Sequence, residues 1–299
     1  MKVRIGFGLG VRTSLNDQDS FGALVDALEE HRFDSLWLSE RITGECPDPV
    51  VALAVAAGRS RRLKLGMSVM VLPGRNPMLV AKELATLDRL SGGRLLPAFG
   101  LGAVDPREQQ AFGVERRERA AWFDESLPLI RRLWTEDRVD HDGPRYHLEG
   151  ASVRPRPAQD PPDVWLGGIA PAELRRIGRL ADGWLPSFVG ASEAAAGREV
   201  VERTAAEHGR EVDPEHFGAL LPYSFDAVPD EVLALLAARR PGVDPSQLVA
   251  AGAQVLVDRI GEFVGAGFSK FVCVPLTDPA GPVGDHLGEL AAIVRPLET

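Results

Sequence analysis

The sequence predicts a (β/α)8 TIM barrel with an insertion after its fourth strand, and three observations support this fold class. Residues 65–72 are almost continuously apolar without alternation, as expected for a parallel strand covered on both faces. A helix expected at 77–90 leads to a second strand at 94–100, and a strand that returns parallel through a helix forms a right-handed crossover unit. This rhythm continues along 299 residues without a shift in composition, and such a barrel commonly takes about 250 residues. We therefore expect residues 1–299 to form a single domain.

The helix predicted at 77–90 has clear end signals. Asn76 can accept hydrogen bonds from the free amides of the first turn, and Pro77 lacks a donor that the first helical position does not need. Gly92 and Gly93 supply a left-handed stop. Apolar residues recur at the spacing of one helical face, namely at Val80, Leu84 and Leu87.

Six further strands are predicted as short apolar segments bounded by glycine, proline or charged residues. In chain order they are 3–8, 34–39, 164–168, 183–187, about 218–225, and 271–274. The first lies among Gly6, Gly8 and Gly10, which let backbone or a ligand come close. The second ends at Glu40 and Arg41, and charges at the carboxyl end of a barrel strand point toward the site.

The remaining helices are expected in amphipathic or alanine-rich segments. They are 20–31, 49–58, 119–134, 171–180, 191–208, 230–239, 254–266, and a closing helix that ends at Pro296. The helix at 49–58 is apolar on most sides, which indicates deep burial or a subunit interface.

Two segments depart from the strand–helix rhythm. Pro97 removes a hydrogen-bond donor from the fourth strand, which predicts a local bulge or a shifted register. Residues 140–162 contain a turn at 141–143 and the prolines Pro155, Pro157, Pro161 and Pro162, so we interpret them as a hairpin and an extended surface excursion. This excursion is the predicted insertion.

Composition indicates a cytoplasmic protein that binds neither nucleic acid nor membrane. The net charge is -9, and the basic residues are scattered, which disfavours a nucleic-acid surface. The two cysteines lie far apart without motif spacing, which fits a reducing compartment. The chain enters a strand directly without a signal-peptide pattern, and its longest apolar run is far short of a membrane span.

Several kinds of chemistry are poorly supported by the residues. The histidines lack metal-ligand spacing with carboxylates or cysteines, and no His-x-His motif occurs at the first strand, so no metal is expected. Lys64 and Lys270 fall at strand starts, where they do not suit Schiff-base chemistry. There is no Gly-x-Ser-x-Gly elbow. The elimination favours chemistry brought by a bound cofactor.

Two glycine segments are candidates for holding such a cofactor. Gly167 and Gly168 precede a helix that opens at Pro171, so backbone amides and the helix dipole could meet a phosphate there. Gly100 and Gly102 follow the fourth strand in the same way. Glycine at such turns is also common for geometric reasons alone. The Glu40–Arg41 pair likewise has two interpretations, a polar pair at the barrel mouth or a surface ion pair.

The run Leu-Asp-Arg-Leu-Ser-Gly-Gly-Arg at 87–94 is the most distinctive motif of the chain. Other notable segments are 34–37, 39–41, 72–77, 81–83, 100–102, 111–114, 165–168 and 181–184. Together they resemble the bacterial luciferase-like flavin and deazaflavin oxidoreductases, in the branch that uses the deazaflavin F420. The resemblance covers most of the chain to about Pro186, and 254–271 is similar to the last helix and strand of that family.

The resemblance implies an isoalloxazine or deazaflavin ring at the carboxyl ends of the strands. The third strand in that family often carries a non-prolyl cis peptide behind the ring, and Ser68–Val69 matches this position. The backbone of 100–102 would line the ring, and 167–169 would meet the phosphate. The cofactor-binding residues expected on this basis are Gly8, Glu40, Ser68, Val69, Met70, Gly100, Leu101, Gly102, Gly167, Gly168 and Ile169.

The expected catalytic residues are Glu40 and Arg41. Glu40 matches an acidic cofactor-contacting position, whereas Arg41 stands where the family often has a catalytic histidine. The similar sugar-phosphate dehydrogenases carry a glutamate after the Gly-x-Gly motif, and Ala103 in its place argues against that activity.

The expected function is that of an F420-dependent oxidoreductase that transfers a hydride between the deazaflavin and an unidentified small organic substrate. The arginine- and alanine-rich composition is typical of high-GC genomes in which such enzymes are common, which favours F420 over FMN. The anionic F420 tail would need a basic exit, with Arg75, Arg107 and Arg12 as candidates. The alternatives are an FMN-dependent luciferase-like monooxygenase and a non-catalytic flavin- or deazaflavin-binding barrel. A homodimer is expected from the resemblance and from the apolar helix at 49–58.

Overall fold

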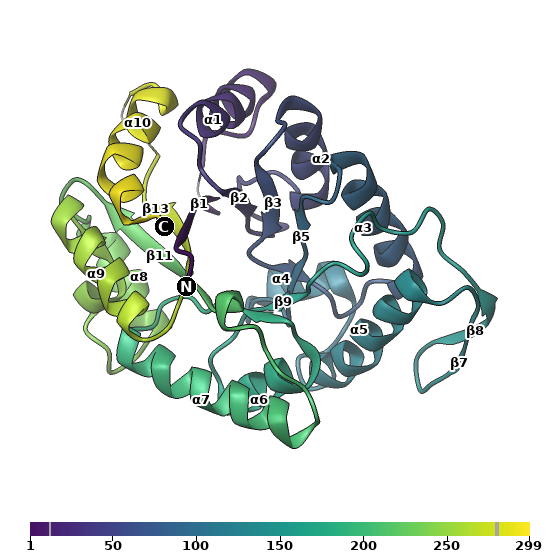
Figure 1. Ribbon diagram of the computed structural model, residues 1–299. Coiled ribbons are helices and arrows are strands. Elements are labelled where there is room, and N and C mark those ends of the chain that lie inside the picture. Colours follow the sequence, from purple (N-terminus) through teal and green to yellow (C-terminus); the bar gives the residue numbers. More distant parts are fainter. Residues whose placement is uncertain (12, 279–280) are drawn as a thin grey trace.

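The computed structural model describes residues 1–11, 13–278 and 281–299. In these residues eight parallel strands close into a barrel that is ringed by helices (Figure 1). The barrel strands are β1 (Arg4–Leu9), β2 (Ser35–Leu38), β3 (Lys64–Met67) continued by β4 (Met70–Val71), β5 (Leu95–Leu96) continued by β6 (Ala98–Gly100), β9 (Trp165–Leu166), β10 (Gly183–Trp184), β11 (Gly218–Ser224) and β13 (Lys270–Pro275). β1 pairs with β2 and β13, and two bridges, Trp184–Phe217 and Ser187–Leu220, join β10 to β11. This ring of pairings confirms the predicted barrel.

Helices lie where the sequence predicts them, and every predicted end agrees within two residues. They are α1 (Gln18–Glu30), α2 (Pro49–Arg59), α3 (Pro77–Ser91), α5 (Arg119–Thr135), α6 (Pro171–Leu180), α7 (Ala191–Glu207), α8 (Asp230–Arg239), α9 (Ala253–Gly265) and α10 (Val283–Val294). The Asn76 side chain accepts from the amides of the first turn of α3, and Gly92 ends it with φ 73°. One further helix, α4 (Pro106–Phe112), has no counterpart in the prediction, because seven residues in a polar stretch show no clear period.

The third and fourth barrel strands are both interrupted. The continuous strand predicted at 65–72 is wrong at its middle, where β3 stops at Met67 and β4 starts at Met70. The peptide bond between Ser68 and Val69 is cis, which confirms the position expected from the resemblance. Pro97 separates β5 from β6, which is the irregularity expected of a residue that cannot donate to the ladder.

Two tryptophans are the largest side chains of the cluster in the barrel interior. Trp37 and Trp165 are 0% and 1% exposed, and their rings meet edge to face with centroids 6.2 Å apart. A Cβ at Gly66 would lie 2.3 Å from the Trp37 ring, and one at Gly183 would lie 2.5 Å from the Trp165 ring. Glycine on the neighbouring strand therefore makes room for each indole.

We expect Gly66→Ala to destabilise the fold by about 1–3 kcal/mol, because its methyl group overlaps a buried ring that cannot move away. Urea unfolding measures the change. The matched control is Gly261→Ala on α9, because a Cβ added there has nothing within 4 Å. This variant should raise the free energy of unfolding by up to about 1 kcal/mol. Equal midpoints for wild type and Gly66→Ala would contradict the tight packing.

The insertion consists of the hairpin β7 (Val139–Asp142) and β8 (His147–Ala151) followed by an irregular segment that returns to β9, as predicted. Asp88 on α3 holds this segment in place. Its fully buried carboxylate accepts from the Ala158 amide (2.7 Å), the Gln159 amide (2.9 Å) and the Gln159 side chain (2.7 Å). The distinctive motif at 87–94 therefore has a structural role.

Asp88→Ala is expected to lower the free energy of unfolding by about 2–4 kcal/mol, since several donors lose their acceptor at once. Denaturant unfolding gives the value. Glu149→Ala removes an exposed carboxylate of the same insertion and should change stability by less than about 0.5 kcal/mol. A similar loss in both variants would show that Asp88 does not anchor the insertion.

Candidate functional site

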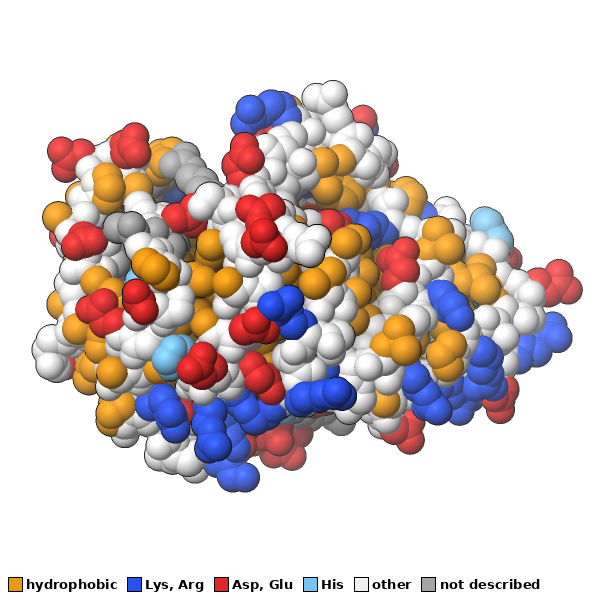
Figure 2. Space-filling view, turned by 90° about the horizontal axis from the view of Figure 1, so that it is seen from above, with side chains coloured by type: hydrophobic (Ala, Val, Ile, Leu, Met, Phe, Trp, Pro, Cys, Tyr) orange, Lys and Arg blue, Asp and Glu red, His pale blue; other side chains and the backbone are white. Residues whose placement is uncertain are grey.

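The carboxyl ends of the strands lie on the side of the barrel that is distant in Figure 1, where α4 is drawn faintly. Figure 2 views the molecule from above, and its upper edge is notched between two raised parts, with hydrophobic side chains in the notch. The predicted cofactor-binding residues lie at or near the carboxyl ends of β1, β2, β3, β6 and β9.

Val69 is the point at which several predicted residues meet. A Cβ added to Gly100 would lie 2.5 Å from Val69 Cγ2, and one added to Gly167 would lie 3.3 Å from Val69 Cγ1. Val69 itself is partly exposed and packs against the interior cluster that contains Trp165. The structure thus brings the cis peptide close to the ends of the fourth and fifth barrel strands. At those two strand ends the residues that face Val69 are glycines, which carry no side chain.

Gly8 and Met70 are buried at the strands instead of being open to the mouth. A Cβ at Gly8 would meet Val274 Cγ2 at 2.7 Å, so Gly8 gives space to a side chain of β13. Met70 is 0% exposed and belongs to the main hydrophobic core. Ser68 is held by Ser39, whose hydroxyl donates to the Ser68 carbonyl at 3.1 Å.

Glu40 is a buried carboxylate that anchors β4. Its side chain is 2% exposed, accepts from the Val71 amide at 2.7 Å, and forms an ion pair with Arg75. Burial raises the pKa of Glu40, although Arg75 and the Val71 amide act in the opposite direction. The Tyr146 hydroxyl from the insertion donates to the Arg75 carbonyl at 3.0 Å, so the insertion supports this pair.

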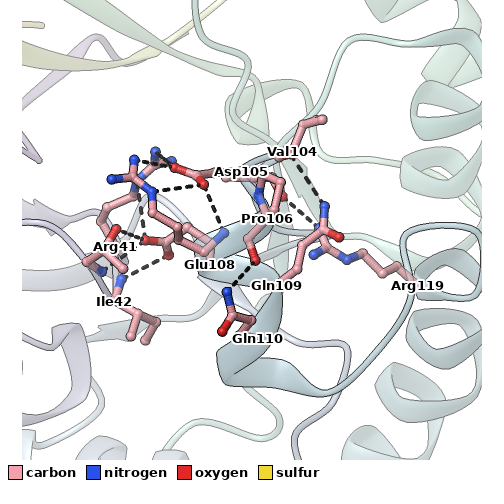
Figure 3. A network of polar contacts seen from close by, with 12 residues as sticks. Arg41, Ile42, Val104, Asp105, Pro106, Glu108, Gln109, Gln110 and Arg119 are labelled. Atoms are coloured by element: carbon pink, nitrogen blue, oxygen red, sulfur yellow. Dashed lines mark hydrogen bonds and ion pairs between the residues drawn. The ribbon is translucent and has the colours of Figure 1, made fainter.

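Arg41 belongs to a different network, which is shown in Figure 3. Its guanidinium pairs with Asp105 at 3.3 Å and with Glu108 of α4 at 3.6 Å. Glu108 also accepts from the amides of Ile42 (3.0 Å) and Thr43 (2.9 Å). Arg41 and its neighbours therefore fasten the loop after β2 to α4 across the rim, and its catalytic role stays a prediction.

The loop after β6 is hydrogen-bonded to a buried arginine of α5. Arg119 is 4% exposed and donates to the carbonyls of Leu101 (3.2 Å) and Ala103 (2.8 Å). Gly102 has φ 86°, which few other residues adopt, and a Cβ there would lie 2.9 Å from Val71. Sequence reasoning missed Arg119, because nothing in the spacing links it to a loop sixteen residues earlier.

The turn at 167–169 is not an open cradle of amides. The carboxylate of Glu173 accepts from the amides of Ile169 and Ala170, both at 2.9 Å, at the start of α6. Gly168 has φ 110°, and its carbonyl accepts from the Trp184 indole at 2.9 Å. Glu173 was also missed, although its place in the first turn after Pro171 is a capping-box position and could have signalled it.

The proposed basic exit is largely paired within the chain. Arg75 binds Glu40, and Arg107 binds Asp105 at 2.8 Å, while Arg12 lies outside the described residues. Among residues 1–11, 13–278 and 281–299, no group of three His, Cys, Asp or Glu side chains is placed to hold a metal ion. Within the same ranges, none of the helices is both long enough and apolar enough to cross a membrane.

Comparison with known proteins shows the family of the chain. The profile of the family described as luciferase-like monooxygenase matches residues 4–266, so the chain belongs to that family. An F420-dependent glucose-6-phosphate dehydrogenase of Nakamurella multipartita is 31% identical over 238 residues, which are 74% of this chain and 68% of the relative. Other curated relatives are matched over as little as 50% of their own length.

Solved structures show the same fold at low sequence identity. An F420-dependent secondary alcohol dehydrogenase in complex with an F420–acetone adduct superposes with a TM-score of 0.83 at 19% identity, and the match covers 100% of both chains. The FMN-bound oxygenating constituent of 3,6-diketocamphane monooxygenase from Pseudomonas putida gives 0.78 at 17% identity, over 100% of this chain and 99% of the other. These likenesses establish the barrel fold.

Proposed function

We propose that this chain is an F420-dependent oxidoreductase that transfers a hydride between the deazaflavin and a small organic substrate. The observation that carries the proposal is the meeting of Val69, Gly100 and Gly167 at the ends of the third, fourth and fifth barrel strands, where the two glycines make room for the Val69 side chain behind the proposed ring position. The relative named as an F420-dependent glucose-6-phosphate dehydrogenase supports the choice of cofactor. When bound, the deazaflavin supplies the two-electron hydride chemistry.

The residues that would hold the ring are Ser68, Val69 and the backbone of 100–102, with Gly167 on the facing side. Glu40 keeps β4 in register through the Val71 amide and is the proposed group for exchanging a proton at its carboxyl oxygens. Arg41 is proposed as a fixed positive charge at the rim. Its two carboxylate partners keep it in place.

Titration of the purified protein with F420 and, separately, with FMN tests the proposal through the fluorescence of each cofactor. Micromolar or tighter binding of F420, with much weaker binding of FMN, is the expected result. Preference for FMN would favour the alternative of an FMN-dependent monooxygenase, which the FMN-bound structural neighbour supports. Binding without turnover of any acceptor would favour the non-catalytic barrel. Arg41 and Ala103 support that alternative, because they replace a histidine and a glutamate of the similar enzymes.

We further propose that residues 1–299 form a single cytoplasmic domain that assembles as a homodimer through α2 and α3. These helices pack together and expose apolar side chains at Val51 (66%), Val55 (52%), Leu79 (62%) and Leu90 (78%). An exposed apolar surface of this kind is typical of a subunit interface.

Val55→Asp is expected to convert the dimer to a monomer, because a charge buried in an apolar interface has no partner. Light scattering after size exclusion measures the mass. Leu235→Asp on α8, which is 50% exposed, is the control and should leave the mass unchanged. A wild-type protein that elutes as a monomer would contradict the proposed assembly.

A further inference from the structure

A cavity on the outside of the barrel, between α5 and α6, is lined largely by arginines. Its volume is about 190 Å³, and Arg131, Arg179 and Arg210 form part of its wall together with Leu127, Pro128 and Leu180. Arg131 comes from α5, Arg179 from α6, and Arg210 from the segment that follows α7. Three positive side chains around one hollow stand out in a chain whose net charge is -9, because they concentrate the opposite sign at one place.

The carboxylates that touch these arginines are shared, so they do not balance the positive charge. Asp182 binds Arg131 with one oxygen at 2.7 Å and Arg210 with the other at 3.1 Å. Asp124 binds Arg179 at 3.1 Å and a second arginine of α6 at 2.6 Å. Four guanidinium groups are therefore in ion-pair contact with two carboxylates.

Two further carboxyl groups of this region belong to other contacts. Asp163 lies 3.7 Å from the His216 ring nitrogen Nε2, and Asp213 accepts from the Glu215 amide at 2.8 Å. Within the part of the chain that the structure describes, neither forms an ion pair with an arginine of the cavity. The excess of positive charge at the cavity wall therefore stays uncompensated by direct contact.

The arginines are held in place while several of their donors have no acceptor. Arg131 Nη2 donates to the Leu180 carbonyl at 2.9 Å, and Arg210 Nη1 donates to the Gly178 carbonyl at 3.0 Å. Among the described residues, no acceptor is bonded to Nε or Nη1 of Arg131, to Nε or Nη1 of Arg179, or to Nε of Arg210. The Nε group of Arg131 is also shielded from solvent, where an unmet donor costs free energy.

The end of α6 accounts for part of this arrangement. Arg131 and Arg210 bind the carbonyls of its last turn, which is a common role for cations at a helix C-terminus. Arg179 binds no carbonyl of α6, and its single partner Asp124 already has another arginine. Helix capping therefore explains two of the three arginines and leaves Arg179 without a capping role.

We propose that this cavity binds a small oxyanion of the phosphate or sulfate class. Guanidinium groups match the oxygens of such anions, because their planar forks donate two parallel hydrogen bonds. The cavity is smaller than the roughly 300 Å³ at which pockets for drug-sized ligands begin, which suits a free ion or the phosphate group of a small ester.

The place of the cavity in the barrel sets what the anion would do. Asp182 lies just before β10 and accepts from the Val164 amide just before β9 at 2.9 Å, so the arginines act on the amino ends of these strands. The candidate cofactor site is at the carboxyl ends. A ligand at the amino ends contributes to stability rather than to the reaction, because it binds the folded chain alone.

Titration calorimetry of the whole chain with inorganic phosphate, sulfate and glycerol 3-phosphate tests the site, with chloride keeping the ionic strength constant. We expect dissociation constants in the millimolar range or tighter and a melting temperature that rises with phosphate concentration. Tighter binding of the ester than of the free ions would identify a phosphate ester as the source of the group, and the reverse order would identify the free ion. Either order supports the oxyanion site, whereas no binding to wild type overturns it.

Arg179→Gln should weaken phosphate binding about tenfold, because one charged donor of the wall is lost. The fold should survive, since Asp124 keeps its other arginine at 2.6 Å. Arg175→Gln is the matched control: it removes an exposed arginine from the same helix and should leave the dissociation constant within twofold of wild type.

Two results for the variants would overturn the proposal. An unchanged dissociation constant in Arg179→Gln would place the bound phosphate elsewhere, and equal weakening in Arg179→Gln and Arg175→Gln would show attraction to the general charge of α6. Fluorescence titration with F420 separates this site from the proposed function. Arg179→Gln should bind F420 as wild type does, and saturation with F420 should leave the phosphate constant unchanged. Displacement of phosphate by F420 would assign the phosphate to the mouth and overturn the second site.

Discussion

Gly100→Ala is expected to lower the affinity for F420 at least tenfold, which is the largest effect that we predict for a single methyl group. The new Cβ would lie 2.5 Å from Val69 Cγ2, well inside van der Waals contact. Rotation about χ1 of Val69 is restricted because the side chain is β-branched, so it has little freedom to turn away. The overlap therefore pushes Val69 toward the proposed ring position, which would exclude a flat cofactor.

Fluorescence titration with F420 measures this loss, and unfolding in urea shows whether the fold survives. The double variant Gly100→Ala with Val69→Ala should recover part of the affinity, because it removes the clashing methyl groups. Gly284→Ala is the control, since nothing lies within 4 Å of its added Cβ. Unchanged affinity in Gly100→Ala would place the ring away from the fourth strand and would contradict the proposed site.

Glu40→Gln is expected to change the pH dependence of stability. Burial raises the folded-state pKa of Glu40 above its unfolded value, so the folded protein binds the proton more tightly. Stability contributed by this group is fully present below the unfolded pKa and is lost as pH rises through the folded pKa. Glutamine resembles the protonated form, so the variant lacks this loss and should gain stability relative to wild type between acidic and neutral pH.

Urea unfolding of both proteins from pH 4 to pH 8 measures the difference. Glu40→Ala is the comparison, because it leaves the Val71 amide and the partly buried Arg75 without a partner, and it should cost about 2–4 kcal/mol throughout. If Glu40→Gln instead becomes less stable than wild type as pH rises, the Arg75 pair outweighs burial and Glu40 is ionised in the folded protein.

Local signals identified the helices well, and they could not identify the contacts that shape the mouth. Asn76 and Gly92 mark the ends of α3 through bonds to neighbours a few residues away, so their effect is visible in the sequence. Arg119 acts on a loop that the fold brings to it, and Glu108 acts on a loop from another strand. Nothing local distinguishes such residues from ordinary surface charges.

In the candidate site, too, some features were predicted from the sequence and others were not. Glycine positions and the family resemblance predicted a cofactor site at the carboxyl ends of the third, fourth and fifth barrel strands, and the structure brings Val69, Gly100 and Gly167 close together there. Arg41 was expected to be catalytic from its position after β2, yet its side chain points to Asp105 and Glu108 of the rim. A position in a sequence sets where a backbone lies, whereas the direction of a long side chain depends on what surrounds it.

The amino-acid sequence by itself determined the order of strands and helices, the insertion, and the glycines at the strand ends. These features depend on hydrophobic period, capping and turn residues, which act over a few positions. Only the tertiary structure decided that Trp37 and Trp165 meet in the barrel interior, that Asp88 holds the insertion, and that Glu173 occupies the amides of the α6 turn. Such contacts join residues through space, and their energy depends on distances that no local pattern records.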